Sequence, residues 1–74
     1  MKVKEVIEQY GEDKQYMVRD EYEGVYWDRE CEGSWYDYAD GWIDDLDDEE
    51  VLEVKADAYP EEGIILIIVD TSLN

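Results

Sequence analysis

The sequence contains no histidine and no phenylalanine, and it has one cysteine and one proline in 74 residues. Without histidine the chain cannot build the Cys–His or Ser–His pair that activates many protein nucleophiles. The lone Cys31 excludes an internal disulfide, and it cannot form a zinc site without further cysteine or histidine ligands. No glycine-rich phosphate loop is present. These absences predict a protein that is not an enzyme and that carries no cofactor.

Basic residues are also scarce. Lysine and arginine together number 6 against 23 acids, which gives a formal charge of −17 at pH 7. Residues 30–54 contain 11 of the acids and no base. Such a field opposes direct binding to nucleic acid or to an anionic membrane, and it favours a basic protein surface as the partner. The composition therefore points toward protein binding.

Three features predict a cytoplasmic protein. A chain without a possible disulfide is typical of a reducing compartment. The lysines near the start are not followed by the apolar run of a signal peptide. The strongly apolar run Ile64–Val69 is much too short to cross a bilayer. We accordingly expect no membrane association.

The length and the aromatic content predict one folded domain, residues 1–74. A chain of 74 residues is near the lower limit at which a hydrophobic core suffices alone. The hydrophobic fraction of 45%, with three tryptophans and seven tyrosines, argues against intrinsic disorder despite the charge. Tyrosine and tryptophan bury a ring and keep a polar end, which suits half-exposed or interfacial positions.

The start of the chain has a helical pattern. Val3, Val6, Ile7 and Tyr10 recur at helical spacing, and Gly11 stands where a C-terminal cap is expected. The spacing predicts a helix over residues 2–10.

Four strands are predicted, three from alternating apolar and polar residues and one from a continuous apolar run. The first is Gln15–Asp20 and the second runs over residues 25–31, with an acidic turn between them. Residues 35–38 either continue the second strand past a bulge or lead into a helix. A third strand is expected over residues 52–59. Ile64–Val69 is apolar on both faces, which predicts a central strand covered on both sides.

Residues 40–50 are predicted to form a second short helix. Asp40 suits the N-cap, and Trp42, Ile43 and Leu46 would face inward. The resulting order, helix–strand–strand–helix–strand–strand, is an α+β fold with a mostly antiparallel four-stranded sheet and two short helices. Because two short helices leave part of the sheet uncovered, a homodimer that buries the second face is a further hypothesis.

The acidic segment at residues 35–50 is the candidate functional site. Acids at the C-terminal end of a helix oppose its dipole, which suggests a charge requirement beyond folding. Held rigidly, these carboxylates would imitate the phosphates of a nucleic acid, with aromatic side chains as anchors. The predicted contact residues are the acids Asp37, Asp40, Asp44, Asp45, Asp47, Asp48, Glu49 and Glu50, and the aromatic residues Trp35, Tyr36 and Tyr38. Charge reversal at positions 44, 45, 47 and 48 is expected to abolish binding and to spare the fold.

Two other interpretations of this segment need comparison. If Gly41 were the sixth residue of an EF-hand loop, Tyr36 and Tyr38 would stand where carboxylates are required, so a calcium loop is excluded. We expect Ca²⁺ or Mg²⁺ to bind the acids weakly, but we do not expect this binding to be the function of the protein. A run of acids is also common as a solvated face. The alternative function is therefore a structural or assembly module that dimerises or docks through its sheet, with the charge serving solubility.

The chain resembles known groups of proteins in its opening segment, its size, its acidity and its mixed α/β pattern. The opening KVKEVIEQYGED, the strand and acidic turn that follow, and the closing apolar strand resemble a broad group of small phage and mobile-element proteins. In size, acidity and mixed α/β pattern the chain is similar to anti-CRISPR proteins that act as DNA mimics. This resemblance implies an inhibitor that occupies the basic DNA-reading groove of a CRISPR effector nuclease, in the host cytoplasm if the protein is phage-encoded. No individual residue is carried over, and the aromatic richness departs from the pattern.

Overall fold

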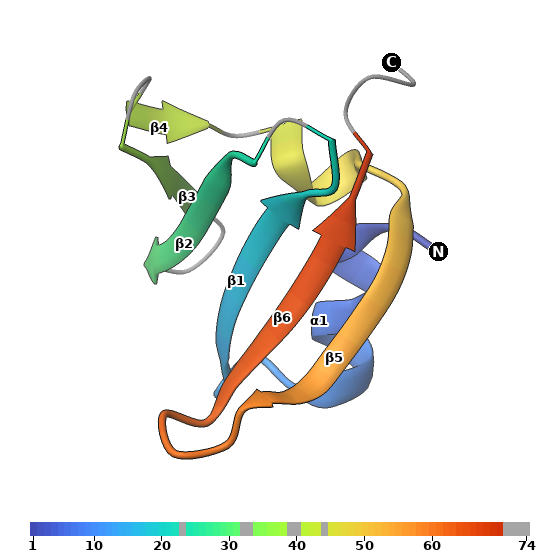
Figure 1. Cartoon of the computed structure of the whole chain (residues 1–74), viewed down its shortest axis with the longest axis vertical. Coiled ribbons are helices and arrows are strands. Elements are labelled where there is room, and N and C mark those ends of the chain that lie inside the picture. Colours follow the sequence, from blue (N-terminus) through green and yellow to red (C-terminus); the bar gives the residue numbers. More distant parts are fainter. Residues whose placement is uncertain (23, 32–33, 39–40, 44, 71–74) are drawn as a thin grey trace.

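A computed structural model describes residues 1–22, 24–31, 34–38, 41–43 and 45–70, with the backbone alone described at positions 30, 31, 42, 43 and 45. The fold is α+β, with an α-helix packed against one face of a twisted sheet (Figure 1). The elements are α1 (Val3–Tyr10), β1 (Gln15–Asp20), β2 (Tyr26–Cys31), β3 (Ser34–Asp37), β4 (Gly41–Ile43), the 3₁₀ turn η1 (Asp45–Asp48), β5 (Val51–Tyr59) and β6 (Ile64–Val69). The sheet order is β4-β3-β2-β1-β6-β5.

Helix α1 forms as its periodicity predicts. Val3, Val6 and Ile7 are buried on its inner side. The Glu5 carboxylate accepts a hydrogen bond from the Lys2 backbone N–H at 2.9 Å, which satisfies a donor at the start of the helix. The helix ends at Gly11, whose φ of +111° is strained for any residue with a side chain, and a Cβ there would meet Asp13 Oδ1 at 2.7 Å.

The centre of the sheet is a parallel pair. β1 and β6 align from Gln15 opposite Ile64 to Asp20 opposite Val69, while every other neighbouring pair of described strands is antiparallel. The sheet is therefore mixed, with β6 between β1 and β5 as the sequence predicts for an inner strand. Its α1 side meets the helix in one apolar core that includes two tryptophans.

The predicted helix over residues 40–50 is wrong among the described residues. Gly41 has φ +85°, which is outside the helical region, and β4 pairs with β3, with Tyr36 opposite Trp42. Only residues 45–48 coil, as a 3₁₀ turn. Consecutive aspartates are poor helix formers, and the aromatic and β-branched residues beside them suit a strand. The sheet therefore contains β3 and β4, which the four-stranded prediction does not include.

Residues 35–38 follow neither of the two predicted paths. Ser34–Asp37 forms the separate strand β3, which returns antiparallel to β2 and places Trp35 opposite Arg29. The register shifts between Arg29 and Cys31, so an irregularity is present, but in a hairpin and not in one continuous strand.

The face of β6 that looks away from α1 is covered within the chain. Leu66 and Ile68 are 3% and 1% exposed. Their cross-strand neighbours include Met17 and Lys55 beside Leu66, and Arg19 beside Ile68. Long side chains of this kind lay their apolar stems over a sheet and keep the polar ends in water. A second copy of the chain is not required to bury this strand, so the homodimer stays a hypothesis.

We predict that Tyr16→Phe lowers the free energy of unfolding by about 1 kcal/mol. The Tyr16 hydroxyl donates to the Gly11 carbonyl oxygen and so fastens the end of α1 to β1. Burial raises the pKa of Tyr16, although Arg29 opposes the shift. The contribution of the hydroxyl is thus present below the pKa of an unfolded tyrosine and is lost as the pH rises through the raised folded pKa. Urea denaturation at neutral and alkaline pH measures both effects.

The matched control is Tyr22→Phe, because Tyr22 is exposed. Equal stability of Tyr16→Phe and the wild type at neutral pH would contradict the role given to this hydrogen bond.

Candidate functional site

Two of the predicted contact residues are part of the interior. Trp35 lies fully buried in the core, and Asp37 is buried as well, which contradicts the expectation that they meet a partner. The Trp35 Nε1–H donates to Asp47 Oδ1 at 2.8 Å. A buried indole N–H usually has such an acceptor, and through this hydrogen bond Asp47 connects η1 to Trp35 of the sheet. The reversal of four aspartates that was expected to spare the fold therefore removes a structural contact.

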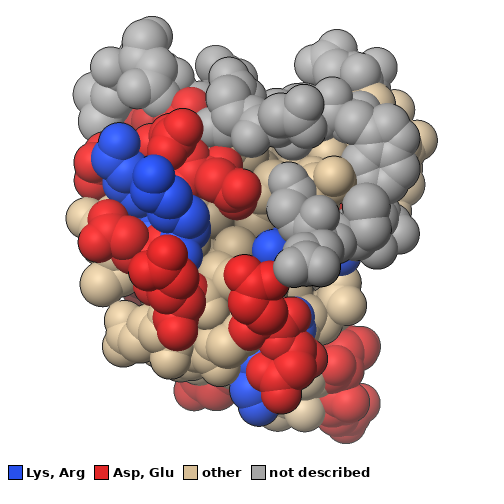
Figure 2. Space-filling model, turned by 180° about the vertical axis from the view of Figure 1, so that it is seen from behind, with Lys and Arg blue, Asp and Glu red and all other residues tan. Residues whose placement is uncertain are grey.

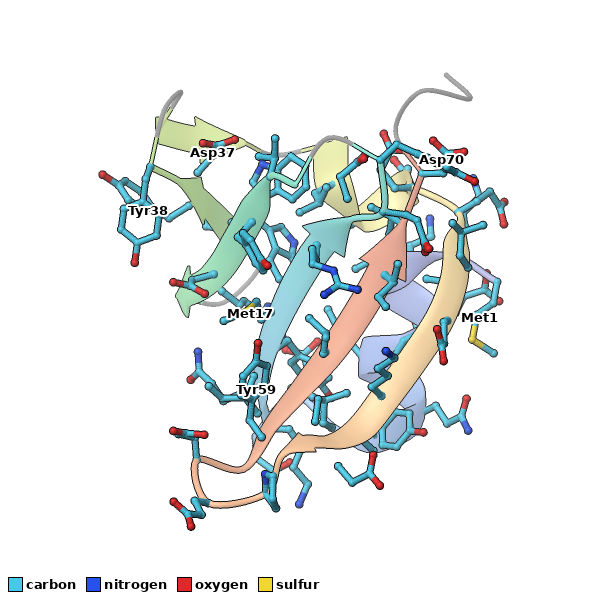
Figure 3. The ribbon with its side chains drawn as sticks, viewed as in Figure 1. Met1, Met17, Asp37, Tyr38, Tyr59 and Asp70 are labelled. Atoms are coloured by element: carbon cyan, nitrogen blue, oxygen red, sulfur yellow. The ribbon has the colours of Figure 1, made fainter. Side chains whose placement is uncertain are left out.

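Tyr36 and Tyr38 lie on the other face of the sheet. Their rings pack edge to face, with centroids 5.1 Å apart and an interplanar angle of 85°. The Tyr38 hydroxyl donates to Asp28 Oδ2 at 3.0 Å, and Asp28 stands opposite Tyr36 in the β2–β3 register. Tyr38 is 73% exposed and lies at the far edge of the hairpin, away from α1 (Figure 3). The predicted aromatic anchors are thus divided between the core, which contains Trp35, and a tyrosine pair in which Tyr36 is half-buried and Tyr38 is exposed.

Acids at the end of η1 and just after it form ion pairs with the N-terminal segment. Asp48 Oδ1 is 3.1 Å from Lys4 Nζ, and Glu50 Oε2 is 3.2 Å from the terminal amino group of Met1. The Val3 N–H donates to the Glu49 carbonyl oxygen, which brings this segment beside the start of α1. The contact role of Asp48, Glu49 and Glu50 stays a prediction. Asp40, Asp44 and the side chain of Asp45 lie outside the described residues.

Exposed carboxylates of α1 join the acids beside η1. Figure 2 shows the α1 side of the molecule, where acids gather on both sides of a stripe of basic atoms. We define the acidic face by Glu5, Glu8, Glu12, Asp48 and Glu50, all of them exposed. Sequence reasoning treated the α1 acids as an ordinary solvated face, because their distance from residues 35–50 in the chain concealed that η1 packs beside the helix.

Arg29 lies under this face as a buried cation. Its guanidinium carbon is 5.9 Å from the ring centroids of both Tyr16 and Trp35, so the cation is placed between two aromatic side chains. Arg29 Nη2 is 3.8 Å from Glu12 Oε2, and the buried Nε has no hydrogen-bond partner in the structure. Alternation along the strand puts Arg29 on the same face as Val25 and Trp27, but the sequence did not identify it as a site residue.

The described residues show neither a membrane span nor a metal site. No helix among them is long and apolar enough to cross a membrane. No three cysteines or carboxylates of the described part come together in a way that would hold a metal ion. Comparison with protein-family models, curated proteins and solved structures finds no match to this chain. The function proposed below therefore rests on the geometry and the charge of the molecule.

We predict that Asp47→Ala destabilises the fold by about 1–3 kcal/mol, because it leaves the Trp35 Nε1–H buried without an acceptor. Asp47→Asn retains a side-chain oxygen and is expected to cost less. Asp57→Ala, at an exposed position of β5, is the control. Urea denaturation followed by tryptophan fluorescence measures all three. If Asp47→Ala were as stable as the control, the acid would be free for partner binding alone.

We predict a small, pH-dependent loss of stability for Asp48→Asn. The hydrogen bond from Lys4 lowers the pKa of Asp48 and raises that of Lys4. For an aspartate with a lowered folded pKa, the stabilisation is present at neutral pH and disappears as the pH falls through that pKa. The wild type and Asp48→Asn should therefore converge in acid. Thermal denaturation from neutral to acid pH, at low and high salt, tests this; a difference that persisted in acid would contradict an ionic origin.

Proposed function

We propose that the protein binds a basic surface of a partner protein through its acidic face and competes there with nucleic acid. The observation that carries the proposal is the charge: −17 on a molecule whose Cα radius of gyration is 11.2 Å. Glu12, Asp48 and Glu50 of the acidic face form ion pairs within the chain, but 6 lysines and arginines cannot neutralise 23 acids. Uncompensated charge of one sign attracts a surface of the opposite sign and accelerates encounter with it.

The arrangement on α1 supports competition with a phosphate backbone. Glu5 and Glu8 are separated along the helix by about 4.5 Å at ~1.5 Å per residue. This is comparable with the rise of about 3.4 Å per phosphate along one DNA strand. The helix is anchored through Val3, Val6 and Ile7 in the core, so its acids lose less freedom on binding than those of a flexible tail.

The finer form of the proposal concerns the kind of partner. Nucleic-acid-binding proteins present grooves of lysine and arginine, and the arginines that read the motif beside a CRISPR target are one example. The likeness in character to DNA-mimicking anti-CRISPR proteins motivates this example. The proposal is therefore an inhibitor or decoy in the cytoplasm, acting on a protein such as a CRISPR effector nuclease.

The alternative is an assembly module that associates through the sheet face opposite α1. The exposure of Tyr26 and Tyr38 on that face favours it, since tyrosine is common in protein interfaces. The burial of Leu66 and Ile68 argues against it, because the apolar side chains that would drive association are already covered. The two functions differ in salt response, since apolar association is not weakened by salt.

We predict that neutralising four acids of the acidic face weakens binding about 30-fold. Four exposed ion pairs at roughly 0.5 kcal/mol each contribute about 2 kcal/mol. The variant is Glu5→Gln/Glu8→Gln/Asp48→Asn/Glu50→Gln, in which the amides keep a hydrogen-bond acceptor. The control is Glu21→Gln/Glu53→Gln/Glu61→Gln/Glu62→Gln, which removes the same charge elsewhere and leaves both proteins at −13, four units from −17.

The partner is first captured from a bacterial lysate with the tagged wild type at low salt and then purified. Its affinity for each variant is measured at two salt concentrations, with and without a competing DNA duplex. Loss of binding confined to the acidic-face variant, together with displacement by salt and DNA, is expected. Equal loss in both variants would contradict the assignment to this face. Binding that resists salt and DNA would favour the assembly module.

A further inference from the structure

A small cavity opens at the edge of the acidic face. Its volume is about 80 Å³, and it lies between α1, the segment after the helix, β2 and η1. It opens on the side of the molecule that Figure 2 shows. The lining residues are Lys4, Ile7, Glu8, Glu12, Arg29 and Asp47.

Arg29 supplies the cavity with a buried positive charge. Its side chain is 10% exposed, and its guanidinium lies between the rings of Tyr16 and Trp35. Aromatic faces stabilise a cation but accept none of the conventional hydrogen bonds that a guanidinium donates. Among the described residues, Glu12 provides the carboxylate oxygen paired with Arg29; it is 3.8 Å from Nη2, which is beyond hydrogen-bond distance. Nε is buried and unpartnered.

A buried guanidinium in this state favours a planar acceptor. Burying a donor without an acceptor is costly, and a carboxylate matches the fork of an arginine in a bidentate pair. Arg29 lines the cavity, so a carboxylate that entered would meet the guanidinium. Arg29 is thus the part of the site that would bind the carboxylate group of a ligand.

The other charged residues of the cavity restrict which carboxylate-containing molecules can bind there. Glu8, Glu12 and Asp47 line the same space, together with Lys4, whose ammonium group pairs with Asp48. The whole molecule carries −17. A bare anion is repelled by this field. A molecule without net charge is not repelled, and a positive group on it meets the acids. Asp47 uses Oδ1 for Trp35, and a carboxylate has further acceptor positions to offer.

We propose that the cavity binds a small zwitterion, an amino acid of about the size of glycine. Its carboxylate pairs with the Arg29 guanidinium, and its ammonium group is received by the carboxylates of Glu8 and Asp47. The size follows from the volume of about 80 Å³, roughly half of the ~150 Å³ cavity that accommodates benzene in another protein. The cavity shares Glu8 and Glu12 with the acidic face, but the binding of a small zwitterion requires no partner protein.

The test is a titration of isotope-labelled protein with glycine, acetate or methylammonium, observed by NMR at the Arg29 Nε–H. We expect glycine to shift this signal with a dissociation constant of about 1 mM. Acetate lacks the ammonium group and methylammonium lacks the carboxylate, so each is expected to bind at least about tenfold more weakly, because each loses one charge-assisted pair.

Two variants assign the binding to Arg29. Arg29→Met keeps a similar apolar stem and removes the charge. It should lose glycine binding about tenfold or more, observed at neighbouring backbone amides, with its folded state checked by the dispersion of the same NMR spectrum. Arg19→Met, at a half-buried position on the opposite face, should bind glycine as the wild type does. Arg29→Lys keeps the charge without the fork and should bind weakly.

Three results would overturn the proposal. The first is no shift at the Arg29 signal with glycine at ~100 mM, about a hundredfold above the expected dissociation constant. The second is unchanged glycine binding by Arg29→Met. The third is acetate binding as tightly as glycine, which would show that the acids of the cavity play no part. None of these outcomes bears on the capture experiment, so the two proposals fail independently.

Discussion

The parallel pairing of β1 with β6 beneath α1 is the constraint on which the remaining structure depends. It joins residues 15–20 to residues 64–69, and every other element is placed by reference to it. β2 and β3 extend the sheet from β1 and carry Arg29 and Trp35 to the α1 side, while β5 extends it from β6. The acids of α1 and η1 become neighbours only because both elements pack on the same face of this pair.

The elements that could be predicted are those whose pattern is local. The helical spacing of Val3, Val6 and Ile7 and the apolar run at β6 each specify an element and its inner face, and the structure contains both. A parallel pairing has no such local signature, because it depends on contacts between residues about fifty positions apart. The sequence alone therefore could not predict that the sheet is mixed.

The candidate site was harder to predict than the fold. In residues 40–50 the spacing of Trp42, Ile43 and Leu46 is compatible with a helix, yet pairing of this segment with β3 prevails. Trp35 and Asp47 were treated as surface contacts, because nothing in the order of residues shows that an indole and a carboxylate twelve positions apart share a buried hydrogen bond. Charge is visible in a sequence, but the division of that charge between structural pairs and open surface is not.

The position of β5 at the rim of the sheet has a consequence for self-association. An edge strand exposes unpaired backbone groups that can recruit a strand of another molecule and begin a fibril. The N-terminal segment covers the start of β5: Lys2 forms a bridge with Glu50 just before the strand, and the Val51 N–H donates to the Met1 carbonyl oxygen. The register along the strand is broken twice. Farther along, Glu53 and Asp57 are exposed. Two copies that approached edge to edge along β5 would bring these like charges together, and their repulsion would oppose the pairing of the two edges.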